Sequence, residues 1–401
     1  MQLVAYGAQD IYLTGNPQIT FFKVVYRRHT NFSMEAIAQT FNGTVGYGNR
    51  VTATISRNGD LVHRMYLEIA CANAASVGGA IAQANFGSAI IQDVELEIGG
   101  QKIDKHTGLW METWAELTEP NPSAHTALQT LAGATDLSGT NFQNMSMMGG
   151  VCGVDAMTEI TKITVPLQFW FCRNPGLALP LIALQYHEVK TIINISTAAN
   201  AHGTGVLVAR SGNAPSMTLW CDYIYLDTDE RRRFAQVSHE YLIEQVQSES
   251  KTGLTMELNF NHPVKELIWV GTPVAAATDV DKGVSTPKVI GTGTYQLKLN
   301  GHDRFAARDY RYFTRTQIWE HHTGPGGLTP NAASGPAACG DTIGVYSFAL
   351  KPEEHQPSGT CNFSRIDNAQ LIGDSTDITV FAVNYNVLRI MSGMGGLAYS
   401  N

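Results

Sequence analysis

The sequence contains few charged residues. Only 15% of its 401 positions are Asp, Glu, Lys or Arg, and the formal net charge is -8. A surface that binds nucleic acid through the phosphates needs a surplus of Lys and Arg, because the release of counterions drives this binding. We therefore expect no direct nucleic acid binding.

Long apolar runs and paired cysteines are also missing. No stretch of about 18 apolar residues exists, and the first residues, MQLVAYGAQDIYL, lack the basic start and apolar core of a secretory signal. No CxxC pair of the kind that binds zinc or does redox chemistry occurs. We expect all cysteines to stay reduced in a protein made in the cytoplasm. They are Cys71, Cys152, Cys172, Cys221, Cys339 and Cys361.

Motifs of enzymes and of metal or cofactor sites are absent as well. The chain has no GxGxxG, P-loop, HExxH, GxSxG or EF-hand pattern. His321 and His322 are adjacent, and neighbours on an extended chain point to opposite faces, so we expect an exposed pair and no metal site. Glu353, Glu354 and His355 follow a proline and predict an acidic turn rather than acid–base chemistry. The sequence thus predicts no catalytic residue, no cofactor and no metal.

Five glycosylation sequons occur, but without a secretory signal we expect them to be silent. The glycosylation state itself is left open. The sequons begin at Asn31, Asn42, Asn144, Asn194 and Asn362.

Glycine and short strand-like segments are abundant. The chain holds 38 Gly and 44% hydrophobic residues, which suits a packed protein of short strands and many turns. Several segments alternate apolar and polar residues, as half-buried strands do. The segments predicted as strands include Arg50 to Ser56, Leu61 to Ala70, Ile90 to Ile98 and Glu188 to Ser196.

Two stretches predict long surface loops. Residues 73–87 and 130–153 are rich in Gly, Ala, Asn and Ser, which disfavour core strands. Met145, Met147 and Met148 lie in the second stretch. They are interpreted either as a contact patch or as part of a loop folded on itself.

The second half of the sequence echoes the first in order, and the alternative interpretation is chance similarity among β sequences. A strand with a glycine turn leads into an aromatic-rich stretch, an apolar segment read as a strand ends in a turn with proline, and an aromatic-rich strand closes each half. These pairs are 95–100 with 296–301, 168–175 with 346–352, and 219–226 with 380–388. The length favours two domains, with one large domain as the alternative. The repeat fits two jelly rolls better than one large barrel.

A helical linker is predicted between the halves. Asp227 to Val246 opens with capping Asp and Thr and continues with good helix formers. Arg231, Arg232 and Arg233 directly follow two acidic residues, so we expect a solvated linker or an interdomain ion pair instead of a phosphate site.

Four long stretches resemble the major capsid proteins of nucleocytoplasmic large DNA viruses, the group that includes chlorella viruses and iridoviruses. The stretches are 13–34, 179–189, 222–247 and 346–367, and the C-terminal residues 384–401 resemble the closing strand of the family. The resemblance implies an all-β fold of two consecutive eight-stranded jelly-roll β-sandwiches, a double jelly roll, with short helices in loops and linker. We expect an N-terminal arm at 1–24, a first jelly roll at 25–227, a linker at 228–246 and a second jelly roll at 247–401.

The resemblance also implies a function in the virion. Members of the family form homotrimeric, pseudo-hexagonal capsomers of the outer icosahedral shell, without catalysis. The implied partners are further copies of the chain, neighbouring capsomers, minor capsid proteins and penton proteins, with an internal membrane close by. Assembly is expected in the host cytoplasm.

The arm is the candidate lattice contact. Gly15, Asn16 and Pro17 interrupt any long regular element, yet the arm holds too many apolar residues for a freely solvated tail. We expect them to be buried against a neighbouring capsomer, a minor capsid protein or the underside of the chain itself. They are Ile11, Tyr12, Leu13, Ile19, Phe21 and Phe22.

Two other kinds of protein are the alternatives. A minor capsid or scaffold protein could share the fold, but resemblance across both halves favours the major protein. Jelly rolls also serve as lectins and cupin-type metal enzymes, which need clustered His and carboxylate ligands. The missing motifs argue against these enzymes.

Overall fold

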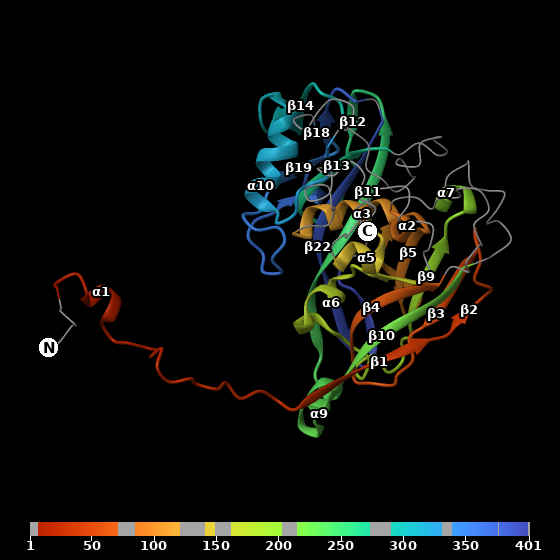
Figure 1. Ribbon diagram of the computed structural model, residues 1–401, viewed down its shortest axis with the longest axis vertical. Helices are drawn as coiled ribbons and strands as arrows, with labels where there is room; N and C mark the ends of the chain where they lie inside the picture. Colours follow the sequence, from red (N-terminus) through yellow and green to blue (C-terminus); the bar gives the residue numbers. More distant parts are fainter. Residues whose placement is uncertain are drawn as a thin grey trace, which may run out of the picture.

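The first half of the chain folds into two packed antiparallel sheets (Figure 1). The computed structural model describes residues 7–70, 85–120, 141–148, 162–202, 215–272, 290–330, 339–375 and 377–399. One sheet has the strand order β1-β10-β4-β7 with β8 beside β4, and the other has the order β2-β3-β9-β5-β6. The strands are β1 (Phe32–Gln39), β2 (Phe41–Asn42), β3 (Arg50–Thr54), β4 (Leu61–Ala70), β5 (Ile91–Ile98), β6 (Gln101–Thr107), β7 (Lys162–Pro166), β8 (Leu179–Pro180), β9 (Val189–Ile195) and β10 (Ser216–Leu226).

The second half contains the same arrangement. Its sheets have the orders β11-β22-β13-β19 and β12-β21-β14-β15. Strands β20, β23 and β16 pair with β13, β22 and β14, and β17 pairs with β18. The strands are β11 (His239–Thr252), β12 (Thr255–Glu257), β13 (Pro263–Gly271), β14 (Thr294–Leu299), β15 (His302–Asp303), β16 (Arg308–Asp309), β17 (Leu328–Pro330), β18 (Cys339–Asp341), β19 (Ile343–Ser347), β20 (Cys361–Asn362), β21 (Ala369–Ile372), β22 (Asp377–Met391) and β23 (Met394–Leu397).

The two halves are jelly rolls of equal topology. In each, the first long strand pairs with the last one, β1 with β10 and β11 with β22, and two further strands continue the sheet. The second sheet of each sandwich also has the same strand order, since β3-β9-β5-β6 in the first domain corresponds to β12-β21-β14-β15 in the second. The predicted all-β double jelly roll is confirmed.

Alternation of side chains explains why β4 forms where it was predicted, at Leu61–Ala70. Met65, Leu67 and Ile69 are buried inside the first sandwich, whereas Tyr66 and Glu68 between them are only half-buried on the outer face. A strand with this pattern gains hydrophobic free energy only when one face meets the core, which fixes its register.

Short helices lie in the connections and in the linker. The longest, α3, lies between the two domains in Figure 1 and begins at Thr107, whose hydroxyl accepts a hydrogen bond of 3.1 Å from the backbone N–H of Trp110. The helices are α1 (Ile11–Thr14), α2 (Phe86–Ala89), α3 (Gly108–Thr118), α5 (Asn141–Ser146), α6 (Trp170–Arg173), α7 (Ala198–His202), α9 (Thr228–Gln236) and α10 (Gln317–His321), the π-helix η4 (Tyr312–Thr316), and the 3-10 helices η2 (Pro175–Leu177) and η5 (Phe363–Arg365).

The predicted apolar strand at 168–175 is wrong. The segment contains the helical turn α6, in which the side chains of Trp170, Phe171 and Cys172 are all buried. Successive residues of a strand point to opposite faces. A helical turn can instead bury three consecutive large side chains against one core.

The linker helix is shorter than predicted. Helix α9 ends at Gln236, and residues from His239 onward form the strand β11. Strand β11 pairs with β22 along its whole length, from His239 opposite Ile390 to Thr252 opposite Asp377. This long ladder overrides the helix propensity of residues 239–246.

Most of the predicted surface loops at 73–87 and 130–153 lie outside the described residues. The described ends are not surface loops. Phe86 and Gly87 lie in the buried helix α2, and Met147 and Met148 are buried in the core beside α5. Only Met145 of the three methionines is exposed, so the described end of this loop packs against the body of the protein.

Candidate assembly surfaces

The described part of the N-terminal arm, residues 7–24, extends away from both sandwiches (Figure 1). All six apolar residues predicted as lattice contacts have exposed fractions between 68% and 99%. Val24, Val25 and Tyr26 are exposed as well. Residues 7–24 are therefore not packed on the described underside of the chain, and the apolar side chains named here are available to another molecule.

The interface between the two domains is buried and apolar. The indole of Trp110 in α3 lies 5.2 Å from the ring of Phe381 in β22, measured between ring centroids. Ile268, Val383 and Phe381 of the second domain belong to the same buried cluster as the core of the first domain. Burial of this kind holds the two jelly rolls together as one unit.

His322 is buried at this interface, contrary to the exposed pair that was predicted. Its Nε2 atom lies 3.0 Å from Oε2 of Glu266, and its Nδ1 atom lies 3.0 Å from Oε1 of Glu353. Burial by itself would lower the pKa of His322, but the two carboxylates outweigh it and raise this pKa to about 9. The imidazolium donates hydrogen bonds to both carboxylates, and Trp114 of α3 meets its ring edge to face at 6.4 Å. The acidic turn that was predicted at Glu353 thus supplies a partner for a buried histidine.

A second group of buried charges crosses the domain boundary. The carboxylate of Glu244 in β11 lies 3.0 Å from the guanidinium of Arg173 in α6 and 3.0 Å from the ammonium of Lys265 in β13. Burial would raise the pKa of Glu244, but the positive charges of Arg173 and Lys265 outweigh it and lower this pKa. Lys265 also donates a 2.5 Å hydrogen bond to the carbonyl of Pro352. Because each charge is paired, the group fixes how the domains meet.

Sequence reasoning missed this second group of charges. A signal was available, because Lys265 and Glu266 interrupt an apolar strand that is buried along nearly its whole length. Charges in such a strand need partners. The partners lie far away in the sequence, on β11 and α6, and only the fold brings them together.

The three arginines of α9 are solvated, as predicted for a linker. Only Arg231 forms a defined ion pair, with Nε 3.0 Å from Oδ1 of Asp60 in the first domain.

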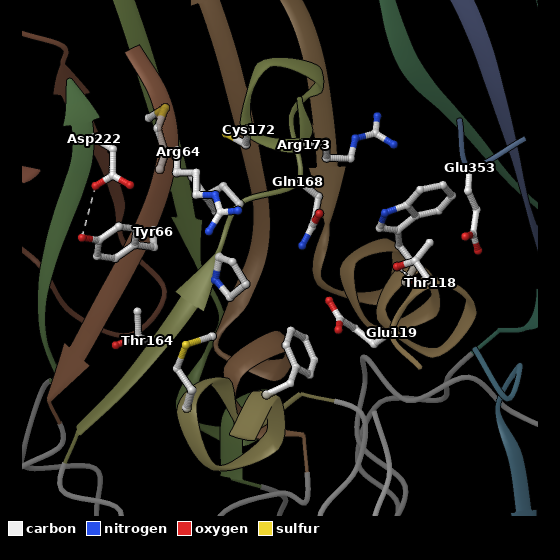
Figure 2. A pocket seen from close by; sticks show the side chains of 16 residues that line it. Arg64, Tyr66, Thr118, Glu119, Thr164, Gln168, Cys172, Arg173, Asp222 and Glu353 are labelled. Atoms are coloured by element: carbon white, nitrogen blue, oxygen red, sulfur yellow. Dashed lines mark hydrogen bonds between the residues drawn. The ribbon is translucent and has the colours of Figure 1, made fainter. Parts of the chain in front are cut away.

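A hollow of about 570 Å³ opens on the outer face of the sheet that contains β4 and β10. Figure 2 shows Tyr66 and Asp222 on one side of it and Thr118 and Glu353 on the other. The hydroxyl of Tyr66 donates a 3.4 Å hydrogen bond to Asp222. Arg173 lies over the ring of Trp114, 5.1 Å from its centroid, at the inner end.

Two further searches of the described residues gave negative results. They contain no group of three or more His, Cys, Asp and Glu side chains that could hold a metal ion. None of their helices is long and apolar enough to cross a membrane.

Comparisons with known proteins agree with the architecture. Residues 20–227 match the family described as "Major capsid protein N-terminus", and residues 230–373 match "Large eukaryotic DNA virus major capsid protein". The major capsid protein of Pyramimonas orientalis virus is 52% identical over 427 residues, which cover 100% of this chain and 99% of that protein. The major capsid protein of Paramecium bursaria Chlorella virus 1 is 42% identical over 472 residues with the same coverage.

Solved structures of capsid proteins are also similar to this chain. The crystal structure of PBCV-1 VP54 matches with a TM-score of 0.74 at 36% identity, over 95% of this chain and 100% of that chain. The Faustovirus major capsid protein matches with a TM-score of 0.65 at 14% identity, which concerns the fold alone. Two jelly rolls of equal topology joined by a buried interface define a double jelly-roll capsid protein. The chain belongs to the family of major capsid proteins of large eukaryotic DNA viruses. It is a structural component of the virus capsid, and its family consists of structural proteins, not enzymes.

Proposed function

We propose that three copies of the chain form a pseudo-hexagonal capsomer of the outer icosahedral shell, with no catalytic role. The observation that carries this proposal is the equal strand order of the two jelly rolls. A three-fold ring of such chains contains six similar sandwiches, which gives a roughly hexagonal outline. Such a tile fills a shell with few gaps.

We also propose a division of the chain into an arm, two jelly rolls and a linker between them. The arm takes residues 1–24, the first jelly roll 25–227, the linker 228–246 and the second jelly roll 247–401. The linker region includes the beginning of β11, which pairs with β22 and so also serves the second sandwich. The buried charges around Glu244 and His322 support a capsomer in which both domains of a chain move as one.

The arm is proposed as the contact with a neighbouring capsomer or a minor capsid protein, and penton proteins are further proposed partners of the capsomer. The support is the exposure of its six apolar residues, which cost hydrophobic free energy while they remain in water. We further propose assembly in the host cytoplasm, with the inner side of the shell near an internal membrane.

Sedimentation of the purified protein tests the trimer. The expected native mass is about three times the chain mass of 43.6 kDa. A protein that stays monomeric at all accessible concentrations in mild buffer contradicts the proposal.

A further inference from the structure

The two domains differ in how their equivalent strands are buried. Strands β13 and β22 of the second domain are buried on both faces, with nearly continuous burial along each strand. Strands β4 and β10 of the first domain alternate, because only the inner face of their sheet is covered. The two sheets have the same strand order, so this difference comes from what lies against their outer faces.

The first domain covers the outer face of the second. Helix α3 supplies Trp110 against Phe381 of β22 and Trp114 against His322. The backbone also joins here, because Gly324 N–H donates to the carbonyl of Leu117 at the end of α3. Both tryptophans of α3 are buried, with exposed fractions of 1% and 4%.

The helix in the same position of the second domain buries one side, through Ile318, but among the described residues nothing covers its other side. Helices η4 and α10 follow the hairpin β14–β15 just as α3 follows the hairpin β5–β6. Trp319 of α10 has an exposed fraction of 82%, and Leu350, whose carbonyl lies 3.2 Å from Nδ1 of His321, is 76% exposed. In Figure 1, α10 lies at the free flank of the second domain, whereas α3 lies between the domains. A tryptophan displayed in this way is typical of the energetic centre of an interface.

We infer that α10 of one copy docks, through Trp319, on the outer face of β4 and β10 of the next copy, over the hollow of Figure 2. The inference rests on the proposed trimer and names the surfaces that form it. The contact between copies repeats the contact that α3 makes inside each chain. Such a head-to-tail contact forms a ring when its rotation closes, and three copies then contain alternating contacts within and between chains.

The chemistry of the two surfaces is complementary. The outer face of the first domain presents Tyr66 and, opposite it in the ladder, Trp220, which offer aromatic surface to an incoming indole. Arg64 is exposed beside the hollow, and Glu320 is exposed beside Trp319. An aromatic centre with charged residues around it is the usual composition of a specific protein interface.

The first experiment compares Trp319→Ala with Phe22→Ala, a matched exposed aromatic residue on the arm, in the full chain. Trimer dissociation is followed by sedimentation at a series of protein concentrations. Loss of an interface tryptophan should weaken association roughly 30-fold or more, since hot-spot residues contribute about 2 kcal/mol or more and 1.4 kcal/mol is tenfold. Phe22→Ala should dissociate like the unaltered chain.

The second experiment does not depend on how Trp319→Ala folds. Arg64→Cys and Glu320→Cys, which keep both Tyr66 and Trp319, are combined in one chain and treated with a short bismaleimide cross-linker. Covalent dimers and trimers should appear on a denaturing gel, at levels far above those of the unaltered chain and of either single variant.

The outcomes separate the inference from the proposed function. Suppose that the Trp319→Ala trimer dissociates at the same concentration as the unaltered trimer, and that the double cysteine variant gives no cross-linked dimers or trimers. The proposed docking of α10 is then wrong, whereas the proposed trimer is not contradicted. If the unaltered chain is a monomer throughout, the trimer itself is wrong. Dissociation of Phe22→Ala with an intact Trp319→Ala trimer would place the arm, and not α10, at the contact between copies.

Discussion

Trp110 in the first domain packs against Phe381 in the second, with their ring centroids 5.2 Å apart. Each ring is almost fully buried, at 1% exposed, although the two residues lie in different jelly rolls. The contact makes the stability of each domain depend on the other. It therefore offers a direct test of how the chain unfolds.

Trp110→Ala should destabilise the protein by about 3–5 kcal/mol, because it leaves a large cavity in a close-packed interface. Chemical denaturation followed by circular dichroism measures the loss. Phe22→Ala, at a position that is 99% exposed, is the control and should change stability by no more than about 0.5 kcal/mol. An equally small effect of Trp110→Ala would show that the domains do not depend on this contact.

The buried His322 predicts a loss of stability on the alkaline side. Its folded pKa of about 9 lies above its ordinary value of 6.5. The stability that it contributes is thus fully present below pH 6.5 and declines until it is lost above about pH 9. His322→Gln should flatten this part of the curve of unfolding free energy against pH. An unchanged alkaline slope in the variant would contradict the prediction.

Glu244 and Glu353 predict a separate loss on the acidic side. Burial would raise the pKa of each carboxyl, but Arg173 and Lys265 at Glu244, and hydrogen bonds from His322 and Thr323 at Glu353, lower it below its ordinary value of 4.5. Their contribution is present above pH 4.5 and lost as the pH falls below it. Glu353→Gln should remove part of the acid slope. The measurement is a series of melting curves at pH values below and above 4.5, the ordinary pKa of a glutamate carboxyl.

Glu116 in α3 should lower the stability of the protein as the pH rises, unlike Glu244 and Glu353. Burial, and then the neighbouring carboxylate of Glu112, raise the pKa of Glu116 well above its ordinary value. The folded protein resists ionisation of this carboxyl, so stability falls as the pH rises from 4.5 toward the raised pKa. Glu116→Gln, which has the same shape and no charge, should therefore be tolerated and should gain stability relative to the unaltered chain as the pH rises. A fall in stability of the variant at pH 8 would contradict this.

The cysteines should remain reduced thiols. Among the described residues, Cys172, Cys221 and Cys361 are free, and burial raises the pKa of Cys172 to about 12. A thiol that stays protonated reacts slowly. Thiol titration of protein from virions should find six groups after denaturation, with Cys172 and Cys221 reacting only once the chain unfolds. A reproducible count below six would indicate a disulfide.

Deletion of residues 1–24 should separate the arm from the folded core. The described part of this segment contacts neither sandwich, so trimer mass and melting temperature should stay nearly unchanged. Formation of closed shells, seen by electron microscopy, should be lost. Loss of soluble trimer would instead assign the arm to the core, and normal shells would exclude a lattice role.

The sequence by itself determined several strands, although the segment 168–175, predicted as a repeated strand, contains a helical turn. The alternation at Leu61–Ala70 predicted β4 with its observed bounds, because only one register places Met65, Leu67 and Ile69 in the core. The repeated strand-and-turn units favoured two similar domains, and the resemblance to the capsid protein family implied that both are jelly rolls. The exposed apolar arm was also visible in the sequence, although its direction was not.

Tertiary structure alone decided which side chains of these helices and strands are buried, and which part of the protein covers them. His321 and His322 are neighbours in the sequence, yet only His322 meets two carboxylates, because β13 and the turn at Glu353 converge on it from distant positions. Trp110 and Trp319 lie in corresponding helices, yet Trp110 is buried and Trp319 exposed. Local sequence sets the pattern of a helix or strand. Whether a neighbouring surface covers it depends on contacts between residues far apart in the chain, or in another copy.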